Sequence, residues 1–171
     1  MRQLDLRLRT YGITAVLGLT TLGGVVPQCA PAPAPAPAPA VAPVSDVQDS
    51  VVQSVNHHRG VAGRAPLAVD ARLTAAARSH SDDLARRQTM SHVGTGGTDG
   101  GQRISSAGFG WSTWGENVAA GQSTPAEVMS AWLASSGHRA NILHGGVSHI
   151  GVAATKGANG VVYWTMVIAA G

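Results

Sequence analysis

Cysteine is almost absent from this chain of 171 residues, which has only Cys29. A single cysteine excludes an internal disulfide, so a folded domain must be held together by the packing of its core. Aromatic residues are also few, at 4% of the chain, and its four tryptophans all lie after residue 110. The C-terminal half is therefore expected to hold the bulkiest part of the core.

Glutamate is the second scarce residue. The nine acidic residues include only two glutamates, Glu116 and Glu127, and both lie in the stretch 114–143. A globular chain normally carries many more glutamates as solvated surface charge, so this placement indicates that the longer carboxylate is needed there. The same stretch contains His138, and His92 lies upstream in the segment MSH. We predict that the two histidines and two glutamates converge in one cleft.

The chain also has no cluster of positive charge. Its formal net charge is +3, and residues 1–30 contribute +2 of it through three arginines and one aspartate. The remaining basic residues are scattered, whereas nucleic-acid binding requires clustered Lys and Arg side chains. We therefore expect no nucleic-acid partner. No hydrophobic run is long enough for a protein that crosses a membrane several times.

The first 44 residues have the composition of an export leader followed by a linker. Residues 1–30 combine an arginine-rich start with an apolar stretch, which predicts an export signal or an uncleaved N-terminal anchor. Cys29 leaves lipidation of its thiol open, although the residues before it match a lipidation motif poorly. Residues 31–44 alternate Ala and Pro, which predicts an extended polyproline II spacer with a reach of about 40 Å. The folded domain is then residues 45–171.

Helical periodicity comes first in that domain, and strands close it. The sequence predicts a helix over 45–59, a second from an Asp70 cap to about Gln88, a helical turn at 102–107, and a helix that begins at Thr124 and ends near 135–137. His80 lies on the apolar face of the second helix and is interpreted as a core residue with satisfied hydrogen bonds. GENVAA is expected to be extended, and strands are predicted at 149–155 and 161–168. This order favours an α+β layered domain.

Two segments are predicted as irregular structure. GTGGTDGG at 94–101 lacks the Lys-Ser/Thr of a phosphate-binding loop and follows no strand, so it is interpreted as a mobile surface loop. GHRANIL at 137–143 is interpreted as a turn between the last helix and the first closing strand.

The four candidate residues suit a divalent cation, because imidazole binds zinc and similar metals and carboxylate adds negative charge. Their spacing is long, however, and the chain has no HExxH or other compact ligand motif. Each residue also has a structural interpretation. Glu127 fits the third position of a helix that starts at Thr124, and Glu116 could be a buried carboxylate satisfied by backbone donors. His92 and His138 could bond helix ends.

A covalent hydrolase has little support in this sequence. Ser135, Ser136 and Ser148 lie near His138, but there is no GxSxG turn, and the single cysteine lies outside the folded domain. Chemistry in the predicted cleft would therefore have to proceed without a nucleophilic side chain.

A resemblance to a known family rests on five segments: MSH (90–92), WGENVAAG (114–121), STPAEVMSAWLASSGHRANIL (123–143), HIGVAA (149–154) and VVYWTMV (161–167). Together they resemble the CAP superfamily, also called the SCP/PR-1-like domain, and in particular its compact bacterial secreted members. The resemblance covers essentially all of residues 45–171.

The resemblance implies a three-layer α-β-α sandwich with a central, mostly antiparallel sheet. It also implies a cleft with two histidines and two glutamates, which matches His92, Glu116, Glu127 and His138 in this chain. In some relatives this set binds zinc or another divalent ion. Other relatives are associated with binding of sterols or fatty acids, or with proteolysis, so no single activity covers the family.

The chain departs from the family pattern at two places. The final strand has Met166 where many bacterial members have glutamine, so a polar group on the cleft side is expected to be missing. The segment between Asp99 and Arg103 is shorter than usual, which is expected to change one rim of the cleft.

We therefore predict an exported, non-enzymatic binding module whose cleft binds Zn²⁺ or another divalent cation and takes a lipid, cell-envelope or protein ligand. One alternative is a metal-dependent hydrolase, in which His92 and His138 hold the ion and a glutamate acts as general base on bound water. Another is a surface interaction module with a vestigial cleft. The chain is expected to be secreted or associated with the cell envelope, to contact a membrane only through its N-terminal segment, and to be a monomer.

Overall fold

The computed structural model describes residues 44–171. The predicted export signal, the linker up to residue 43 and Cys29 lie outside the described residues. Within 44–171, no helix is long and apolar enough to cross a membrane. The described chain forms, in order, α1 (Val44–Val61), β1 (Ala68–Val69), α2 (Ala71–Arg87), the 3₁₀ helix η1 (Thr95–Gly97), α3 (Gly100–Ser106), β2 (Thr113–Ala120), α4 (Pro125–Ala134), α5 (Ser136–Ile142), β3 (His149–Lys156) and β4 (Val162–Ala170).

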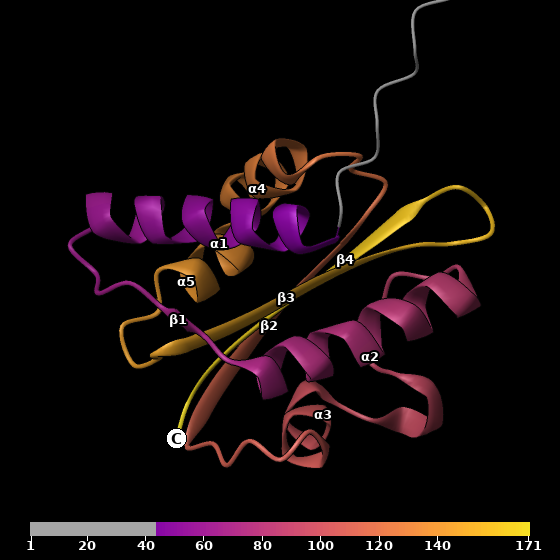
Figure 1. Ribbon diagram of the computed structural model, residues 1–171, viewed down its shortest axis with the longest axis horizontal. Coiled ribbons are helices and arrows are strands. Elements are labelled where there is room, and N and C mark those ends of the chain that lie inside the picture. Colours follow the sequence, from indigo (N-terminus) through magenta and orange to yellow (C-terminus); the bar gives the residue numbers. More distant parts are fainter. Residues whose placement is uncertain (1–43) are drawn as a thin grey trace, which may run out of the picture. The chain divides into compact units, whose positions relative to one another are not determined.

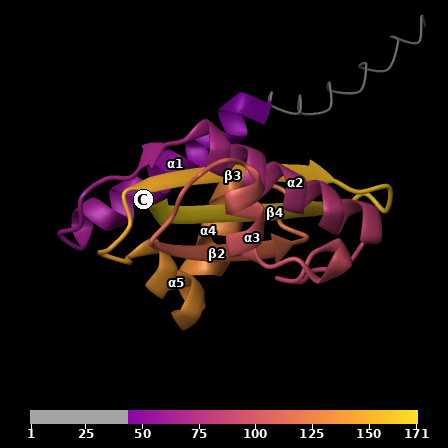
Figure 2. The same ribbon diagram turned by 90° about the horizontal axis from the view of Figure 1, so that it is seen from below.

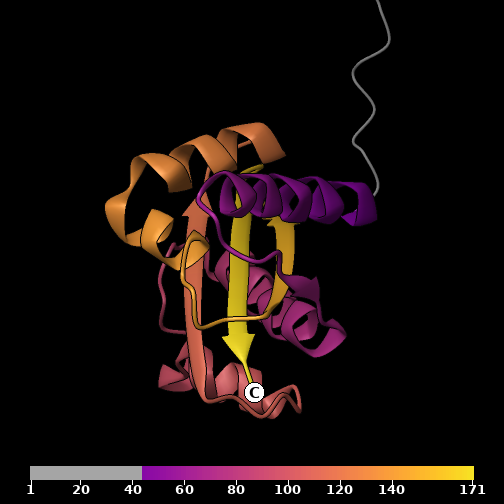
Figure 3. The same cartoon turned by 90° about the vertical axis from the view of Figure 1, so that its left-hand side faces the viewer.

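The strands form one sheet in the order β1-β3-β4-β2. Strand β4 pairs antiparallel with both β3 and β2, and Figure 3 shows it between them, while the short β1 pairs parallel with the start of β3. Helices α1, α4 and α5 lie on one face of the sheet, and α2 and α3 lie on the other (Figure 1). The predicted α-β-α sandwich with a mostly antiparallel sheet is confirmed.

Polar caps fix where the helices begin. The Asp70 carboxylate accepts hydrogen bonds from the backbone amides of Arg72 at 2.8 Å and Leu73 at 3.4 Å, which satisfies donors that the first turn of α2 leaves free. Helix α2 ends before Gln88, whose φ of 53° is left-handed. Thr124 caps α4 through its hydroxyl, followed by proline at the first helical position. The predicted helix starts at Asp70 and Thr124 are thus confirmed.

Helix α2 lies directly against strand β3. A Cβ atom placed on Gly151 would be 2.1 Å from the backbone carbonyl carbon of Leu73, a separation that no side chain tolerates. A glycine inside a strand commonly marks such a close approach of a second backbone. The amide of Asp70 also donates to the carbonyl of Ile150 at 3.0 Å. The start of α2 is therefore fixed against the sheet.

The sheet divides the apolar core into two parts of different size. The larger cluster lies between the sheet and α1, α4 and α5, and it includes the buried Trp132, Trp164 and Met166. Smaller clusters on the other face gather around residues such as Leu73 and Ile104. The bulk of the core is thus on the α1/α4/α5 face, and two of the four tryptophans belong to it.

The structure differs from the sequence prediction in two segments. GHRANIL, predicted as a turn, lies in helix α5 up to Ile142, and its last residue, Leu143, caps the end of that helix. Only Ser135 is extended between α4 and α5, and the chain then resumes a helix that buries Ile142. Residues 94–101, predicted as a surface loop, contain η1 and the start of α3. Three of the five glycines in that segment are buried, and a Cβ on one of them, Gly100, would lie 2.4 Å from the ring of Trp114.

Candidate functional site

The candidate site lies at the β2 edge of the sheet, where the two helical layers come together. Strand β2 is the last in the sheet and is contacted by α3 from one layer and α5 from the other. Figure 2 shows α5 beside this edge. Successive side chains of a strand point to opposite faces, so Glu116 faces the α2/α3 side and Asn117 faces α5.

Glu116 is the centre of a buried ionic network, with an exposed fraction of 6%. Its Oε1 accepts a hydrogen bond from Nδ1 of His92 at 2.9 Å, and its Oε2 accepts one from Nη2 of Arg103 at 2.7 Å. The Nε2 atom of His80 lies 3.9 Å from Oε1. Burial raises the pKa of the Glu116 carboxyl, but His92 and Arg103 outweigh it and bring that pKa below its usual value. The carboxylate is therefore ionised at neutral pH and held in one orientation.

Arg103, from α3, joins this carboxylate to the backbone on both sides of η1. Its Nη1 donates to the carbonyl of Thr98 at 2.7 Å, and its Nη2 donates to the carbonyl of His92 at 3.1 Å as well as to Glu116. The planar guanidinium suits such simultaneous contacts, which an ammonium group could not reproduce. Arg103 thus fixes both the charge of Glu116 and the backbone that carries His92.

The two site histidines differ in environment. The His92 side chain is 58% exposed, and its hydrogen bond to Glu116 raises the pKa of the imidazole. His138 lies in α5 and is half-buried, so burial lowers its pKa, and the nearby charge of His92 lowers that pKa further. The positive charge of His92 therefore disfavours protonation of His138.

Two asparagines attach α5 to the edge of β2. Asn117 Nδ2 donates to the carbonyl of His138 at 3.0 Å, and Asn141 Nδ2 donates to the carbonyl of Glu116 at 3.0 Å. Asn141 also donates to Oδ1 of Asn117 at 2.8 Å. An edge strand exposes unpaired backbone groups, and here the Asn141 side chain donates a hydrogen bond to one of them, the carbonyl of Glu116. The same bonds fix the position of His138 relative to Glu116.

Comparison with known proteins assigns the chain to a family. The model of the Cysteine-rich secretory protein family, CAP, matches residues 52–168. The chain belongs to the CAP family. A relative from Bacillus subtilis (strain 168), the uncharacterized protein YkwD, is 38% identical over 109 residues, which are 64% of this chain and 42% of that protein.

Solved structures agree with this CAP fold. An extracellular protein with an SCP domain from Bacillus anthracis matches with a TM-score of 0.69 and 24% identity, over 75% of this chain and 41% of that one. An outer surface protein of Borrelia burgdorferi matches with a TM-score of 0.66 and 21% identity, over 71% of this chain and 90% of that one. The chain thus spans less than half the length of both Bacillus proteins. At these identities the structural matches establish the fold alone.

Of the four residues predicted for the CAP cleft, His92 bonds Glu116, and His138 lies in α5, which the two asparagines attach to the same β2 edge. Glu127 has a different environment, because it is exposed at the start of α4. Its Oε2 accepts from the amide of Ser123 at 2.7 Å, and its own amide donates to Thr124 Oγ1 at 3.2 Å. The Glu127 side chain thus bonds at the start of α4, as the capping interpretation requires, but to the amide of Ser123 and not to that of Thr124.

A metal ion implied by the CAP resemblance fits this arrangement only in part. Among residues 44–171, no three His, Cys, Asp or Glu side chains are grouped closely enough to hold a metal ion. Arg103 occupies one oxygen of Glu116, and Glu127 is engaged at its helix start. The remaining donors are the two imidazoles, which suit zinc and similar ions better than Ca²⁺ or Mg²⁺. The four-residue ligand set stays a prediction.

Sequence reasoning missed several residues that build the CAP site: Arg103, Asn117, Asn141 and the role of His80. Asn117 and Asn141 lie inside the quoted GEN and GHRANIL segments, so the signal was present in the motif. Arg103 lies outside the quoted motifs, and no residue pattern near it indicates its role. His80 is buried as predicted, and its Nε2 contacts the carbonyl of Ser91 at 2.8 Å, but its Nδ1 has no partner among the described residues.

Met166 lies on the other face of the sheet from Glu116. It is fully buried in the larger apolar cluster, and its neighbours across the sheet are Asn117 and Val152. Glu116 is paired with Val167 instead. A glutamine at position 166 would therefore place its amide beside Asn117 and the α5 attachment, and not beside the carboxylate of the site.

Proposed function

We propose that this chain is an exported CAP-domain binding module that holds a divalent cation such as Zn²⁺ between His92 and His138. The observation that carries the proposal is the hydrogen bond from His92 Nδ1 to the buried Glu116 carboxylate. Because the carboxylate only accepts, Nδ1 carries the proton and Nε2 has the free lone pair when the ring is neutral. Metal-binding histidines commonly donate their second ring N–H to a carboxylate in this way.

In this proposal Glu116 orients His92 and does not bind the ion itself. Its second oxygen is held by Arg103, whose positive charge also opposes a cation in direct contact with that carboxylate. His138 supplies the second imidazole from α5, positioned by Asn117. Two protein ligands leave coordination positions open, so water or a donor group from an external ligand completes the site.

The hydrolase alternative has weaker support. A general base near neutral pH needs a pKa close to that pH, whereas the pKa of Glu116 lies below its usual value because His92 and Arg103 outweigh the effect of burial. Glu127 is exposed and engaged in capping α4. A binding role for the two histidines requires neither carboxylate to act as a base.

Export of the chain is part of the same proposal. Its support is the leader composition of residues 1–30 and the description of structural neighbours as extracellular or outer-surface proteins. An exported CAP domain would meet cell-envelope, lipid or protein ligands outside the cytoplasm. Such a ligand would complete the open positions of the cation.

Calorimetric titration with zinc chloride tests the cation site. The full chain should carry Cys29→Ser, because a free thiol binds zinc on its own. We expect about one equivalent of zinc to bind, with binding lost in His92→Ala/His138→Ala. The matched controls are His144→Ala, an exposed histidine outside the site, and Glu127→Gln; both should bind as the parent chain does.

The controls separate the possible outcomes. Loss of zinc binding in Glu127→Gln would restore Glu127 as a ligand and reject the two-histidine site. Equal binding in the parent chain and the double variant would place zinc elsewhere and reject the proposal. If circular dichroism shows that the parent chain is folded and it binds no zinc, the proposal is also rejected.

A further inference from the structure

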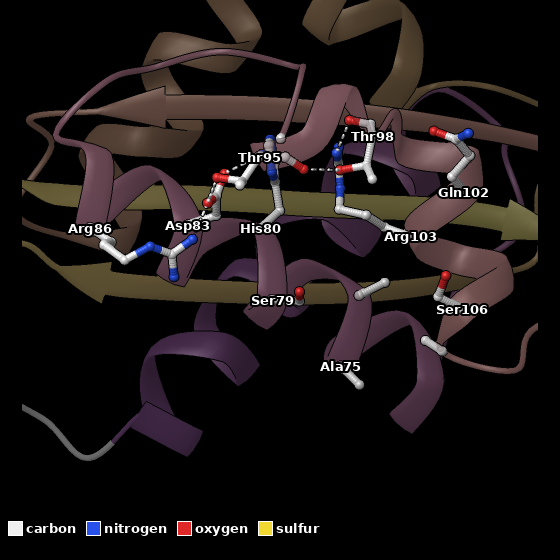
Figure 4. Close-up of a pocket in the computed structure, with 13 residues that line it drawn as sticks. Ala75, Ser79, His80, Asp83, Arg86, Thr95, Thr98, Gln102, Arg103 and Ser106 are labelled. Carbon is white, nitrogen blue, oxygen red and sulfur yellow. Dashed lines mark hydrogen bonds and ion pairs between the residues drawn. The ribbon is translucent and has the colours of Figure 1, made fainter.

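A second hollow lies on the α2/α3 face of the domain, between α2, α3 and residues 94–98. We call it the α2–α3 pocket. Its volume is about 500 Å³, and Figure 4 shows the polar side chains that surround it. Hydroxyl and amide groups contribute much of the wall: Ser79, Thr95, Thr98, Gln102 and Ser106.

This pocket is separate from the proposed cation site. None of His92, Glu116, Glu127 and His138 is among the residues that line it. The two places share a boundary, because Arg103 and His80 line the pocket and also approach the Glu116 carboxylate, Arg103 at 2.7 Å and His80 at 3.9 Å. A ligand in the pocket would therefore contact two side chains that also lie beside Glu116.

Two buried polar atoms of the pocket wall have no hydrogen-bond partner among the described residues: Nδ1 of His80 and Nε of Arg103. The His80 side chain is fully buried, and that of Arg103 is 8% exposed. In Figure 4 the two side chains extend from α2 and α3 toward the 94–98 segment. A buried polar group without a partner destabilises the fold, so these atoms indicate a missing hydrogen-bonding group.

The two atoms have opposite requirements. His80 Nε2 faces the carbonyl of Ser91, which only accepts, so Nε2 carries the proton and Nδ1 of the neutral ring is an acceptor. Burial lowers the pKa of His80, which favours that neutral form. Arg103 Nε–H is always a donor. A hydroxyl group both donates and accepts, so it meets either requirement, whereas a carboxylate or an ammonium group can satisfy only one of the two atoms.

Charge in the pocket is balanced. The positive charge of Arg103 is paired with Glu116, and that of Arg86 is paired with Asp83. An anion would meet the Asp83 and Glu116 carboxylates, and a cation would meet the two arginines, so neither sign is favoured. A lipid tail is disfavoured because it would leave the two buried nitrogens, His80 Nδ1 and Arg103 Nε, without a hydrogen-bond partner. A neutral, hydroxyl-rich molecule remains.

An adjoining hollow extends the pocket across α3. It is also about 500 Å³ in volume, shares Thr98, Gln102 and Ser106 with the first, and is lined by Trp111 and Trp114. Trp111 is 41% exposed. The flat face of an indole can pack against the C–H face of a sugar ring. The indole N–H of Trp111 already donates to the carbonyl of Gly101 and to the hydroxyl of Ser105, so Trp111 offers a sugar its face and not its N–H.

We propose that the α2–α3 pocket binds one unit of a neutral glycan, with sugar hydroxyls at His80 and Arg103 and the next ring over α3 toward Trp111. This binding goes beyond the proposed cation site and requires no metal ion. It gives the domain a carbohydrate-binding surface on the α2/α3 face.

Titration of the ¹⁵N-labelled full chain, followed by backbone amide NMR, tests the proposal. The probes are two neutral disaccharides, cellobiose and N,N′-diacetylchitobiose, with sodium phosphate as the anionic comparison, each up to ~50 mM because single sugar units bind weakly. We expect at least one disaccharide to saturate, with shifts confined to residues 75–80, 94–98 and 101–114. Phosphate should give no saturable shift there.

Matched variants locate the binding. Ala75→Phe fills the pocket from α2 and should weaken the disaccharide by at least about tenfold. The control, Ala71→Phe, puts the same ring one helical turn earlier at an exposed position that does not line the pocket, and it should bind as the parent chain does. Ser106→Phe fills the pocket from α3 and replaces Ala75→Phe if that variant fails to fold.

Three outcomes would overturn the glycan proposal. Saturable binding of phosphate in place of either disaccharide would contradict the charge balance. Equal disaccharide binding in the pocket-filling variant and in Ala71→Phe would place the sugar elsewhere. A folded chain that binds neither disaccharide would remove the proposal, and it would leave the zinc titration unaffected.

Discussion

The two faces of the central sheet are built from different kinds of side chain. Between the sheet and α1, α4 and α5 lies the larger apolar cluster, with the buried Trp132 and Trp164. On the α2/α3 face the apolar clusters are smaller and lie beside most of the buried polar side chains of the described chain: His80, Ser81, Asp83, Glu116 and Thr165. The candidate cation site and the α2–α3 pocket both draw on this polar face.

The apolar face contributes mainly to stability, whereas the polar face carries the candidate sites. A buried large apolar side chain stabilises the folded state by about 1.5–3 kcal/mol, so the α1/α4/α5 face supplies most of the driving force for folding. Buried ion pairs give little net stability, and apolar side chains of similar volume often replace them without loss. The Glu116–Arg103 pair therefore needs another explanation, and positioning of His92 and the pocket wall supplies one.

The largest effect is expected from Trp132→Ala, which opens a cavity in the apolar face. Trp132 is fully buried, and its indole N–H donates to the carbonyl of Val118 at 3.3 Å. We expect a loss of about 3–5 kcal/mol in the free energy of unfolding, measured with urea at pH 7. The control Trp111→Ala, at a 41% exposed position, should cost less than about 1 kcal/mol. Similar losses in the two variants would remove the proposed division between the faces.

A smaller loss is expected when the ion pair on the polar face is broken. Arg103→Leu leaves the Glu116 carboxylate buried beside two histidines, His92 and the more distant His80, without its arginine partner. The free energy of unfolding should therefore fall by roughly 3 kcal/mol. Arg103→Leu/Glu116→Leu should recover most of that loss, because no uncompensated charge remains. Urea denaturation of both variants measures this. A double variant as unstable as the single one would show that the pair itself stabilises the fold.

Asn141→Ala tests the attachment of α5 at the edge between the two faces. It removes hydrogen bonds to the carbonyl of Glu116 and to Asn117, and we expect a loss of about 1–3 kcal/mol. Amide hydrogen exchange should rise in β2 and α5 and stay unchanged in α1. Asn159→Ala, at an exposed turn that holds Tyr163, is the control. Uniform exchange changes would mean that the attachment is not local.

The smallest effect concerns the start of α2 and depends on pH. Hydrogen bonding from Arg72, helped by the first amides of α2, outweighs burial and lowers the pKa of Asp70 to about 2. Because this pKa is lower in the folded than in the unfolded state, the ionised carboxylate stabilises the fold above about pH 4, and the benefit is lost as pH falls toward 2.

Asp70→Asn keeps a capping oxygen and removes the charge. At pH 6 the free energy of unfolding of the parent chain should therefore exceed that of Asp70→Asn by about 1 kcal/mol or less. Thermal unfolding from pH 7 to pH 2 measures this gap, which should close between about pH 4 and pH 2. A gap that widens in acid would show that the Asp70 charge destabilises the fold.

Local signals in the sequence predict the main elements well. The α2 and α4 starts depend on caps written in adjacent residues, at Asp70 and Thr124, and the closing strands have clear apolar patterns. Helix α5 escapes prediction because its seven residues are held by distant partners. Arg59 from α1 donates to the carbonyl of Ile142 at 2.8 Å, and Asn141 bonds β2. No local pattern reports such contacts.

The candidate site is predicted in part. The family resemblance indicates His92, Glu116 and His138, and the capping position of Glu127 is visible in its own sequence context beside Thr124. The role of Arg103 could not be predicted, since its charge is matched by a carboxylate 13 residues away in another element. The glycine-rich segment 94–101 has the composition of a loop, and composition does not reveal that Gly100 lies against Trp114.

The packing of two indoles beside α3 gives the molecule an optical property. Trp111 and Trp114 meet edge to face with ring centroids 6.1 Å apart, and Trp111 is exposed. The other two tryptophans are buried in the opposite layer, where a quencher dissolved in water cannot reach them. Fluorescence that such a quencher removes therefore originates at the rim of α3. The protein carries its own emission probe for events on that surface, without any attached dye.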